Sequence, residues 1–312
     1  MAKNKSKATP STGLQWLPEA SLAALAAAVF LNSLAGGFIT DDKLQLAANP
    51  LVTDQARWTG AFSSGVWDFL GYKSNYYRPL QILIYSAVYH TLGPGPAAFH
   101  LLMLALHALN TVLAFRLARR LLDNPRAAWI AGAIFALHPI HTEAVNWIAA
   151  LPDVLVTTLA LAGLTAFAAG RPQGAMAAPL HGVIYLLALF TKETGVMIAP
   201  LYAAYEWIVA RRSPKNSWRI YAAMAASLAL YLALRVHALG GLAPSQQTHH
   251  HLSAPEFVMS AATILGQYLA YLIWPPQLNF FHIFEATTSP TPVLAASVLA
   301  IGTLLWAALR FR

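Results

Sequence analysis

The sequence contains no cysteine, and only 10% of its 312 residues are charged. The absence of cysteine excludes disulfide bonds and thiolate metal ligands, and it is compatible with either face of a membrane. Soluble domains usually have about 25% charged residues, so the scarcity of charge argues against one. A glycine-rich phosphate-binding loop is also absent, which leaves no motif for a nucleotide-sugar site.

Hydrophobic residues, in contrast, make up 57% of the chain and occur in long runs. A helix that crosses a bilayer needs about 20 apolar residues. Runs near or below this length begin close to Pro18, Ala97, Ala127, Pro152, His181, Gly195, Trp218, Pro255 and Pro292. The runs lack the alternation of membrane strands, and isolated strands would leave backbone groups unpaired in lipid. The sequence therefore predicts an all-α polytopic membrane protein.

The formal net charge of +8 is explained by membrane topology. Lys and Arg occur in short clusters between the apolar runs instead of along one polar face, so we expect no nucleic-acid partner. Cytoplasmic loops of membrane proteins are enriched in these residues. Residues 1–17 are predicted to be a cytoplasmic basic tail, and the next apolar run a retained signal-anchor at the start of a transmembrane domain covering 18–312.

The same charge rule predicts external loops at about 39–96 and 138–151, and an external loop with an interfacial helix at about 237–290. Residues 79–92 are too short to span and are interpreted as a helix at the outer interface. Residues 256–274 are given an interfacial position because a crossing there would place Arg310 and Arg312 outside; whether they span is left open. The chain stops directly after an apolar run with no tetratricopeptide domain, which suggests a short protein or a fragment.

This topology collects unusual polar residues on the external side. Ionisable groups at membrane depth cost a few kcal/mol each, so they usually face a cavity, a partner or a substrate. The external set comprises Asp41, Asp42, Arg78, His100, His138, His141, Glu143, Asp153, Lys192, Glu193, Arg235 and His282.

Two groups within this set suggest chemistry. Either Asp41 or Asp42 is suited to act as a general base if burial raises its pKa, although such a pair also caps helices. Arg78, Lys192 and Arg235 each lie at the expected outer end of an apolar helix, where they are suited to bind a lipid phosphate. Cations at such positions also serve as interfacial anchors or ion-pair partners.

A divalent metal is a weaker possibility, with His138, His141 and Glu143 as ligands. Pro139 interrupts helical geometry between the two histidines, and the HExxH spacing is absent. We therefore assign no cofactor with certainty and keep a divalent metal as a possibility. The run His249-His250-His251 is interpreted as part of a solvated loop.

An ordered set of motifs resembles the transmembrane and tetratricopeptide-repeat-containing O-mannosyltransferases and their bacterial relatives. The motifs are FITDD at 38–42, NP at 49–50, YRPL at 77–80, FH at 99–100, LHALN at 106–110, FALHPIHTEAV at 135–145, KE at 192–193 and WP at 274–275. The HPIHTEAV and YRPL strings are the most specific of these. The chain departs from the family at 150–153, where ALPD stands in place of a pattern with Gly-Arg.

The resemblance implies a GT-C-like helix bundle with an amphipathic first external loop. It also implies a glycosyltransferase that moves a hexose, often mannose, from a polyprenyl-phosphate carrier to an acceptor hydroxyl with inversion. By this resemblance the acceptor is a protein, or a cell-envelope lipid or glycan, on the periplasmic face of a bacterial inner membrane. An inactive lipid-phosphate-binding scaffold or a transporter stays open as an alternative.

The resemblance also implies roles for individual residues. The expected catalytic residues are Asp41, Asp42 and Glu143. The expected donor-phosphate ligands are Arg78, Lys192 and Arg235. The residues expected to orient substrate are His100, His138, His141, Asp153 and Glu193.

Overall fold

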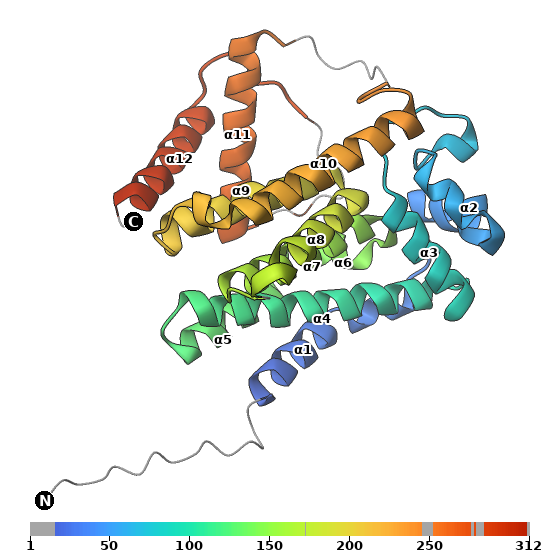
Figure 1. The fold of residues 1–312 in the computed structure, drawn as a ribbon, viewed down its shortest axis with the longest axis horizontal. Coiled ribbons are helices and arrows are strands. Elements are labelled where there is room, and N and C mark those ends of the chain that lie inside the picture. The colour runs from blue at the N-terminus through green and yellow to red at the C-terminus, as the bar shows by residue number, and fades with distance from the viewer. Residues whose placement is uncertain (1–15, 172, 245–251, 276–277, 279–283, 311–312) are drawn as a thin grey trace, which may run out of the picture.

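The computed structural model describes residues 16–171, 173–244, 252–275, 278 and 284–310, and every regular element within them is helical (Figure 1). Six of these helices, counted with adjoining short turns, are long and apolar enough to cross a membrane. They are α4 (Pro96–Leu121), α7 (Leu151–Ala168), α8 (Ala177–Thr191), α10 (Trp218–Leu239), α11 (Ala254–Ile273) and α12 (Pro292–Arg310). The predicted all-α polytopic membrane protein is confirmed.

Proline sets the start of many helices. It occupies the first turn of α4, α7, α11 and α12, where a missing backbone N–H removes no intrahelical bond. The shorter apolar helix α5 (Pro125–Leu137) also starts with proline, and the side chain of Asn124 caps it by accepting from the N–H groups of Arg126 and Ala127. Gly240 ends α10 with φ of 78°, a left-handed conformation that glycine adopts at low cost.

Helix α4 packs against α5, α7 and the short apolar helix α1 (Leu17–Val29), while α8 joins α7 to α10. Polar groups contribute to this packing at two points. Asn110 Nδ2 of α4 donates to the carbonyl of Val154 in α7 at 3.0 Å, and Ser227 Oγ of α10 donates to the carbonyl of Gly182 in α8 at 2.9 Å. Such bonds are common between helices that pack in lipid.

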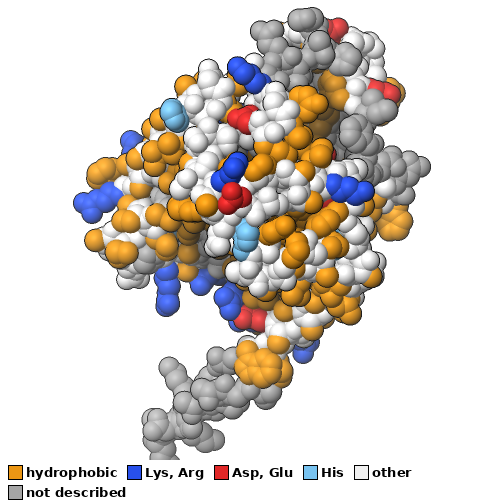
Figure 2. Space-filling model, turned by 90° about the vertical axis from the view of Figure 1, so that its right-hand side faces the viewer, with side chains coloured by type: hydrophobic (Ala, Val, Ile, Leu, Met, Phe, Trp, Pro, Cys, Tyr) orange, Lys and Arg blue, Asp and Glu red, His pale blue; other side chains and the backbone are white. Residues whose placement is uncertain are grey.

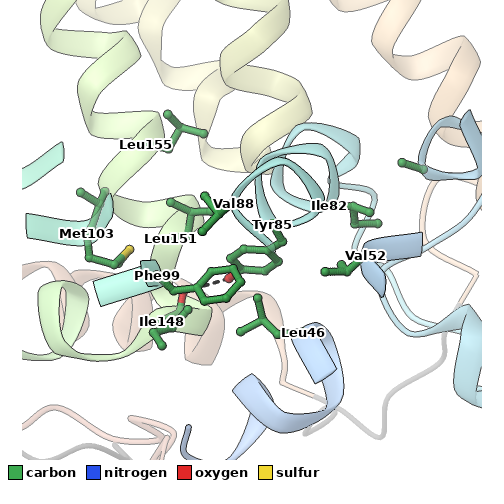
Figure 3. Packing of buried hydrophobic residues seen from close by; sticks show 12 residues of the cluster. Leu46, Val52, Ile82, Tyr85, Val88, Phe99, Met103, Ile148, Leu151 and Leu155 are labelled. Carbon is green, nitrogen blue, oxygen red and sulfur yellow. Dashed lines mark hydrogen bonds between the residues drawn. The ribbon is translucent and has the colours of Figure 1, made fainter. Parts of the chain in front are cut away.

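Short helices gather beyond the first turns of α4 and α7, at the right-hand end of Figure 1. They are η2 (Lys43–Ala47), α2 (Pro50–Thr53), η3 (Gln55–Phe62), η4 (Asp68–Leu70), α3 (Pro79–Thr91), α6 (His141–Asn146) and η5 (Ile148–Ala150). A hydrophobic cluster holds them to the bundle, with Leu46, Tyr85, Phe99, Ile148 and Leu151 among its members (Figure 3). We call this region the loop end, because it contains the first two of the three segments that the charge pattern predicts to be external.

The apolar run near Gly195 does not form one long helix. It forms η7 (Glu193–Met197), α9 (Ile198–Ala204) and η8 (Tyr205–Val209) in succession, and it is not among the six long apolar helices found in the described part of the chain. Pro200 lies in the first turn of α9, where the chain changes from η7 to an α-helix. The chain also turns closely at Gly195, since a Cβ built there would lie 2.6 Å from the carbonyl carbon of Ala188.

Helices α11 and α12 form a pair that packs mainly on itself. Thr287 connects the loop before α12 to α11, because its backbone N–H donates to Ser260 Oγ at 2.8 Å. In Figure 1 α11 runs crosswise to α4, yet it is long and apolar enough to span, so its interfacial placement stays a prediction. The candidate His282 and the run His249-His250-His251, interpreted as solvated loop, lie outside the described residues.

Candidate active site at the loop end

The two neighbouring aspartates at the start of the site have different surroundings. Asp42 is fully buried, and its carboxylate accepts from the N–H of Ile39 at 3.0 Å and from the N–H of Ala149 at 2.7 Å. It makes no capping bond to η2, so the capping interpretation does not describe it. Asp41 is partly exposed, and its carboxylate has no hydrogen-bond or ion-pair partner among the described residues.

Burial raises the pKa of both aspartates above the usual value. For Asp42 the two backbone donors oppose this effect, while the neighbouring Asp41 charge adds to it. A carboxylate with a raised pKa is a better proton acceptor, provided that substrate can reach it. Only Asp41 combines the raised pKa with an accessible, unpaired carboxylate.

Helix α3 also binds the second loop, by which we mean the second predicted external segment at 138–151. The contact is made by Tyr85, next to the bond between Asp42 and Ala149. The Tyr85 hydroxyl donates to the carbonyl of Ile148 at 2.9 Å, as the dashed line in Figure 3 shows. Tyr85 also accepts from Gln81 Nε2 at 3.3 Å, and the same nitrogen donates to Gln45 Oε1 at 2.7 Å. None of these three residues was a sequence candidate; the available signal was a glutamine in each of two otherwise largely apolar segments.

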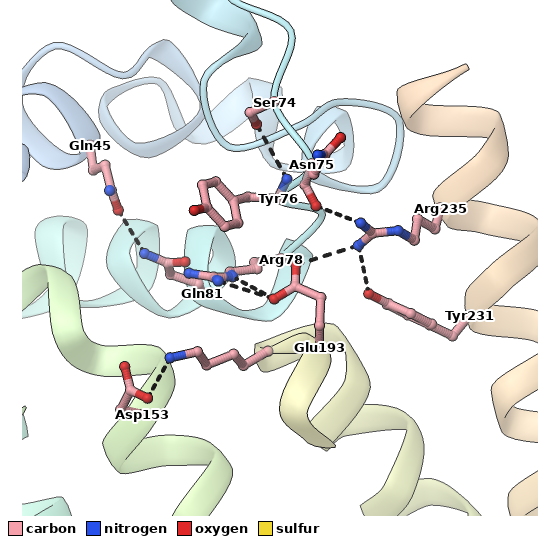
Figure 4. A network of polar contacts seen from close by, with 11 residues as sticks. Gln45, Ser74, Asn75, Tyr76, Arg78, Gln81, Asp153, Glu193, Tyr231 and Arg235 are labelled. Carbon is pink, nitrogen blue, oxygen red and sulfur yellow. Dashed lines mark hydrogen bonds and ion pairs between the residues drawn. The ribbon is translucent and has the colours of Figure 1, made fainter. Parts of the chain in front are cut away.

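A group of cations and carboxylates lies beside the start of α3 (Figure 4). Glu193 at the start of η7 is placed between two arginines: its carboxylate lies 3.0 Å from Arg78 Nη2 and 3.4 Å from Arg235 Nη1. Three segments that are far apart in the sequence therefore meet at one carboxylate. The charge pattern predicts all three residues on one external surface, and the structure brings them together.

The two arginines differ in how much of their hydrogen-bonding capacity is already used. Arg235 is only 7% exposed, and besides Glu193 it donates to the carbonyls of Leu242 and Asn75 and to the Tyr231 hydroxyl. Arg78 donates to Glu193 through Nε and Nη2, and its Nη1 has no partner among the described residues. Its guanidinium also lies over the Tyr76 ring, 4.6 Å from the centroid. Arg78 is therefore the arginine with a free edge for an anion.

Lys192 forms a separate pair with Asp153, 2.5 Å between Nζ and Oδ1, and so joins the end of α8 to the start of α7. Both side chains are partly exposed. Figure 2 views the loop end of the bundle, where acidic and basic side chains lie next to one another among hydrophobic ones. In the two ion-paired groups, three cations meet two carboxylates, which leaves one positive charge in excess.

Tyr85 is the buried residue that joins α3 to the same peptide that Asp42 binds. Burial raises its pKa, and after the Gln81 hydrogen bond the charges of Asp42, Arg78 and Asp41 all act on it. The site therefore has an acidic side, formed by Asp41 and Asp42, and a cationic side that begins at Arg78, the residue before α3.

The histidine candidates His100 and His141 pack against other parts of the protein, in contrast to the accessible Asp41. His100 is buried, with its ring against Gly36, and neither ring nitrogen has a partner among the described residues. His141 packs on Phe135 with ring centroids 4.5 Å apart. Burial, with smaller effects from His107 and His138, lowers the pKa of His141 to about 4, so this ring is neutral near pH 7.

The remaining candidates are Glu143 and the metal site. Glu143 is exposed on α6. His138 Nδ1 accepts from the backbone N–H of Ile140 at 3.2 Å, so this nitrogen is not available as a metal ligand. Within the described residues, no group of three or more His, Asp or Glu side chains is arranged to hold a metal ion.

Fold and site together define an all-α polytopic membrane protein with a charged, partly buried site at one end of its helices. The chain is similar to protein O-mannosyl-transferases. It is 32% identical to Tmtc2 of Drosophila melanogaster over 196 residues, which are 58% of this chain and 21% of that protein. It is 32% identical to human TMTC1 over 222 residues, 64% of this chain and 25% of that protein.

Mouse TMTC2 is 28% identical over 292 residues, 84% of this chain and 35% of that protein. The chain thus spans about a fifth to a third of the length of these curated relatives. The resemblance inferred from the motifs is confirmed by these relatives. No protein-family model and no solved structure matches the chain.

Proposed function

We propose that the chain is a membrane glycosyltransferase that moves a hexose, mannose by analogy with its relatives, from a polyprenyl-phosphate carrier to an acceptor hydroxyl. The acceptor oxygen attacks the anomeric carbon, the bond from that carbon to the phosphate oxygen breaks, and the phosphate leaves with the electron pair. The anomeric configuration is inverted in one displacement. The loop end is the external, periplasmic face of an inner membrane, and the fold is of the GT-C type.

The observation that carries this proposal is the contrast within the aspartate pair. Asp41 is the general base that takes the acceptor proton, because its carboxylate is accessible and unpaired and its pKa is raised. Asp42 holds the loop through its two backbone bonds. This assigns to one residue a role that the sequence left between two.

On the cationic side, Arg78 is the main ligand for the departing phosphate through its free Nη1 edge. Lys192 supplies a second positive charge to the phosphate when its ion pair with Asp153 breaks. Arg235 acts on the phosphate through Glu193 and Arg78, because its own nitrogen atoms already bind protein groups. Glu143, His138 and His141, which are exposed or partly exposed, are left as contacts to sugar or acceptor, whereas His100 is buried.

The proposal is tested with synthetic polyprenyl-phosphate-mannose and a mixture of protein and membrane acceptors. We expect Asp41→Asn to lower kcat at least about 100-fold, on the scale of a lost general base, with unchanged thermal stability. Asp42→Asn is the matched variant. It should lower stability as well as activity, because it disturbs bonds to Ile39 and Ala149.

The pH profile adds a second readout. The base acts when deprotonated, so kcat should rise with pH through a pKa above the usual aspartate value, and this limb should be absent in Asp41→Asn. Equal activity of Asp41→Asn and wild type would refute the assignment of the base. Binding of the donor without any sugar transfer would favour the lipid-phosphate-binding scaffold.

A further inference from the structure

One peptide group of the second loop is held from both edges. The carbonyl of Ile148 and the N–H of Ala149 belong to the same peptide unit. Tyr85 of α3 donates to the carbonyl at 2.9 Å, and Asp42 of the first loop accepts from the N–H at 2.7 Å. Both side chains are almost completely buried, so water does not compete with either bond.

The position of this peptide connects the parts of the proposed site. The Asp42 contact joins residues 107 positions apart in the sequence, and Asp41 precedes Asp42 directly. On the other side, η5 leads into α7, whose first turn contains Asp153, the partner of Lys192. A shift of the peptide would therefore move the carboxylate and the cationic side relative to each other.

Gln81 and Gln45 support the orientation of Tyr85. Gln81 Nε2 donates to both Tyr85 and Gln45, whereas Gln81 Oε1 is buried without a partner among the described residues. A buried unpaired carbonyl oxygen is destabilising, and an apolar side chain of similar size would avoid it. The glutamine is therefore better explained by its effect on Tyr85 than by packing.

We propose that Tyr85, supported by Gln81 and Gln45, is a positioning residue that with Asp42 clamps the Ile148–Ala149 peptide and so fixes Asp41 opposite the phosphate-binding cations. Tyr85 itself touches no substrate in this account. Its consequence for catalysis rests on the proposed function, whereas its structural consequence does not.

The structural consequence is tested by measuring the distance between the two loops. The chain has no cysteine, so cysteines placed at the exposed positions Lys43 and Thr142 are the only labelling sites. Electron–electron double resonance on spin labels at these positions should give a narrow distance distribution in the otherwise wild-type protein. Tyr85→Phe should broaden it, because the loops lose one of the two bonds to their shared peptide.

Tyr89→Phe is the matched control. Tyr89 lies one turn further along α3, is partly buried against the same hydrophobic cluster, and its hydroxyl makes no hydrogen bond among the described residues. This variant should keep the narrow distribution. Asp42→Ala removes the acceptor at the other edge of the same peptide and should broaden the distribution if Tyr85→Phe fails to fold. Equal distributions in Tyr85→Phe and Tyr89→Phe would overturn the clamp.

Kinetics separate positioning from general stability. With polyprenyl-phosphate-mannose as donor, Tyr85→Phe should lower kcat roughly 10- to 100-fold and leave the donor KM unchanged, because a misplaced group affects the reacting geometry more than binding. Tyr89→Phe should match wild type. A rise in KM with constant kcat would contradict positioning. Lack of transfer by the wild-type chain would refute the proposed function, and the distance measurement would still decide the clamp.

Discussion

Two carboxylates in this protein, Glu193 and Glu206, have similar partners and opposite accessibility. Glu206, in η8, is fully buried; its Oε1 accepts from Arg212 Nε at 2.9 Å and from Ser217 Oγ at 2.6 Å, and its Oε2 accepts from the Tyr221 hydroxyl at 2.8 Å. Glu193 also lies among arginine and tyrosine, but its side chain is 32% exposed.

The difference shows how one set of residue types serves structure at one end of the bundle and suits binding at the other. Around Glu206 both oxygen atoms are occupied, so the group joins η8 to the start of α10 and offers nothing to a ligand. Around Glu193 one arginine has a free edge, and the carboxylate stands where an incoming phosphate would compete with it. Accessible, incompletely used charges are the better indication of function.

The largest effect is expected from Glu206. Glu206→Gln removes the charge that accepts from Arg212, Ser217 and Tyr221, and should lower the free energy of unfolding by about 3 kcal/mol, since a buried charged group with several hydrogen bonds is lost. Glu193→Gln is the matched variant and should change it by less than about 1 kcal/mol, because its ion pairs are partly exposed. Unfolding in detergent or lipid nanodiscs measures both.

Equal losses of stability in the two variants would break the comparison, because Glu193 would then be as structural as Glu206. A small effect for both would show that Arg212, which is 40% exposed in its side chain, is adequately solvated without its partner.

The next effect concerns binding. Glu193→Gln removes a negative charge that competes for Arg78, so affinity for a synthetic polyprenyl phosphate should rise about fivefold, which corresponds to about 1 kcal/mol. The gain should shrink at high salt, because the site is partly exposed. Titration in nanodiscs, with Glu206→Gln as the control for altered folding, measures it. Weaker binding by Glu193→Gln would show that Glu193 holds the two arginines in their binding geometry.

The sequence was sufficient to predict most of the long helices and the gathering of polar residues, but not the division of the run near Gly195 into three short segments. Long apolar runs and the prolines at their starts determine α4, α7, α11 and α12, and the charge pattern placed Arg78, Glu193 and Arg235 on one surface. The sequence could not predict the different roles of Asp41 and Asp42. The distinction depends on a bond between Asp42 and Ala149, which is 107 residues away.

The same limit explains Tyr85, Gln81 and Glu206. Tyr85 and Gln81 acquire their significance only when the second loop folds against α3. Glu206 precedes a basic cluster that the charge rule assigns to topology, so its sequence context conceals the pair with Arg212. Which arginine keeps a free edge likewise depends on the backbone carbonyls of Asn75 and Leu242, which have no sequence signal.

The smallest effect is expected from the Lys192–Asp153 pair. It tests whether solvent exposure alone explains why ion pairs at the loop end contribute less to stability than the pair at Glu206. Asp153 is 49% exposed in its side chain and Lys192 is 23% exposed, so Asp153→Asn should change the free energy of unfolding by less than about 0.5 kcal/mol despite the 2.5 Å contact. The same unfolding assay measures this change. A loss comparable to that of Glu206→Gln would mean that joining α8 to α7 matters more than solvent access, and Lys192 would then be a structural cation and a poor candidate for binding phosphate.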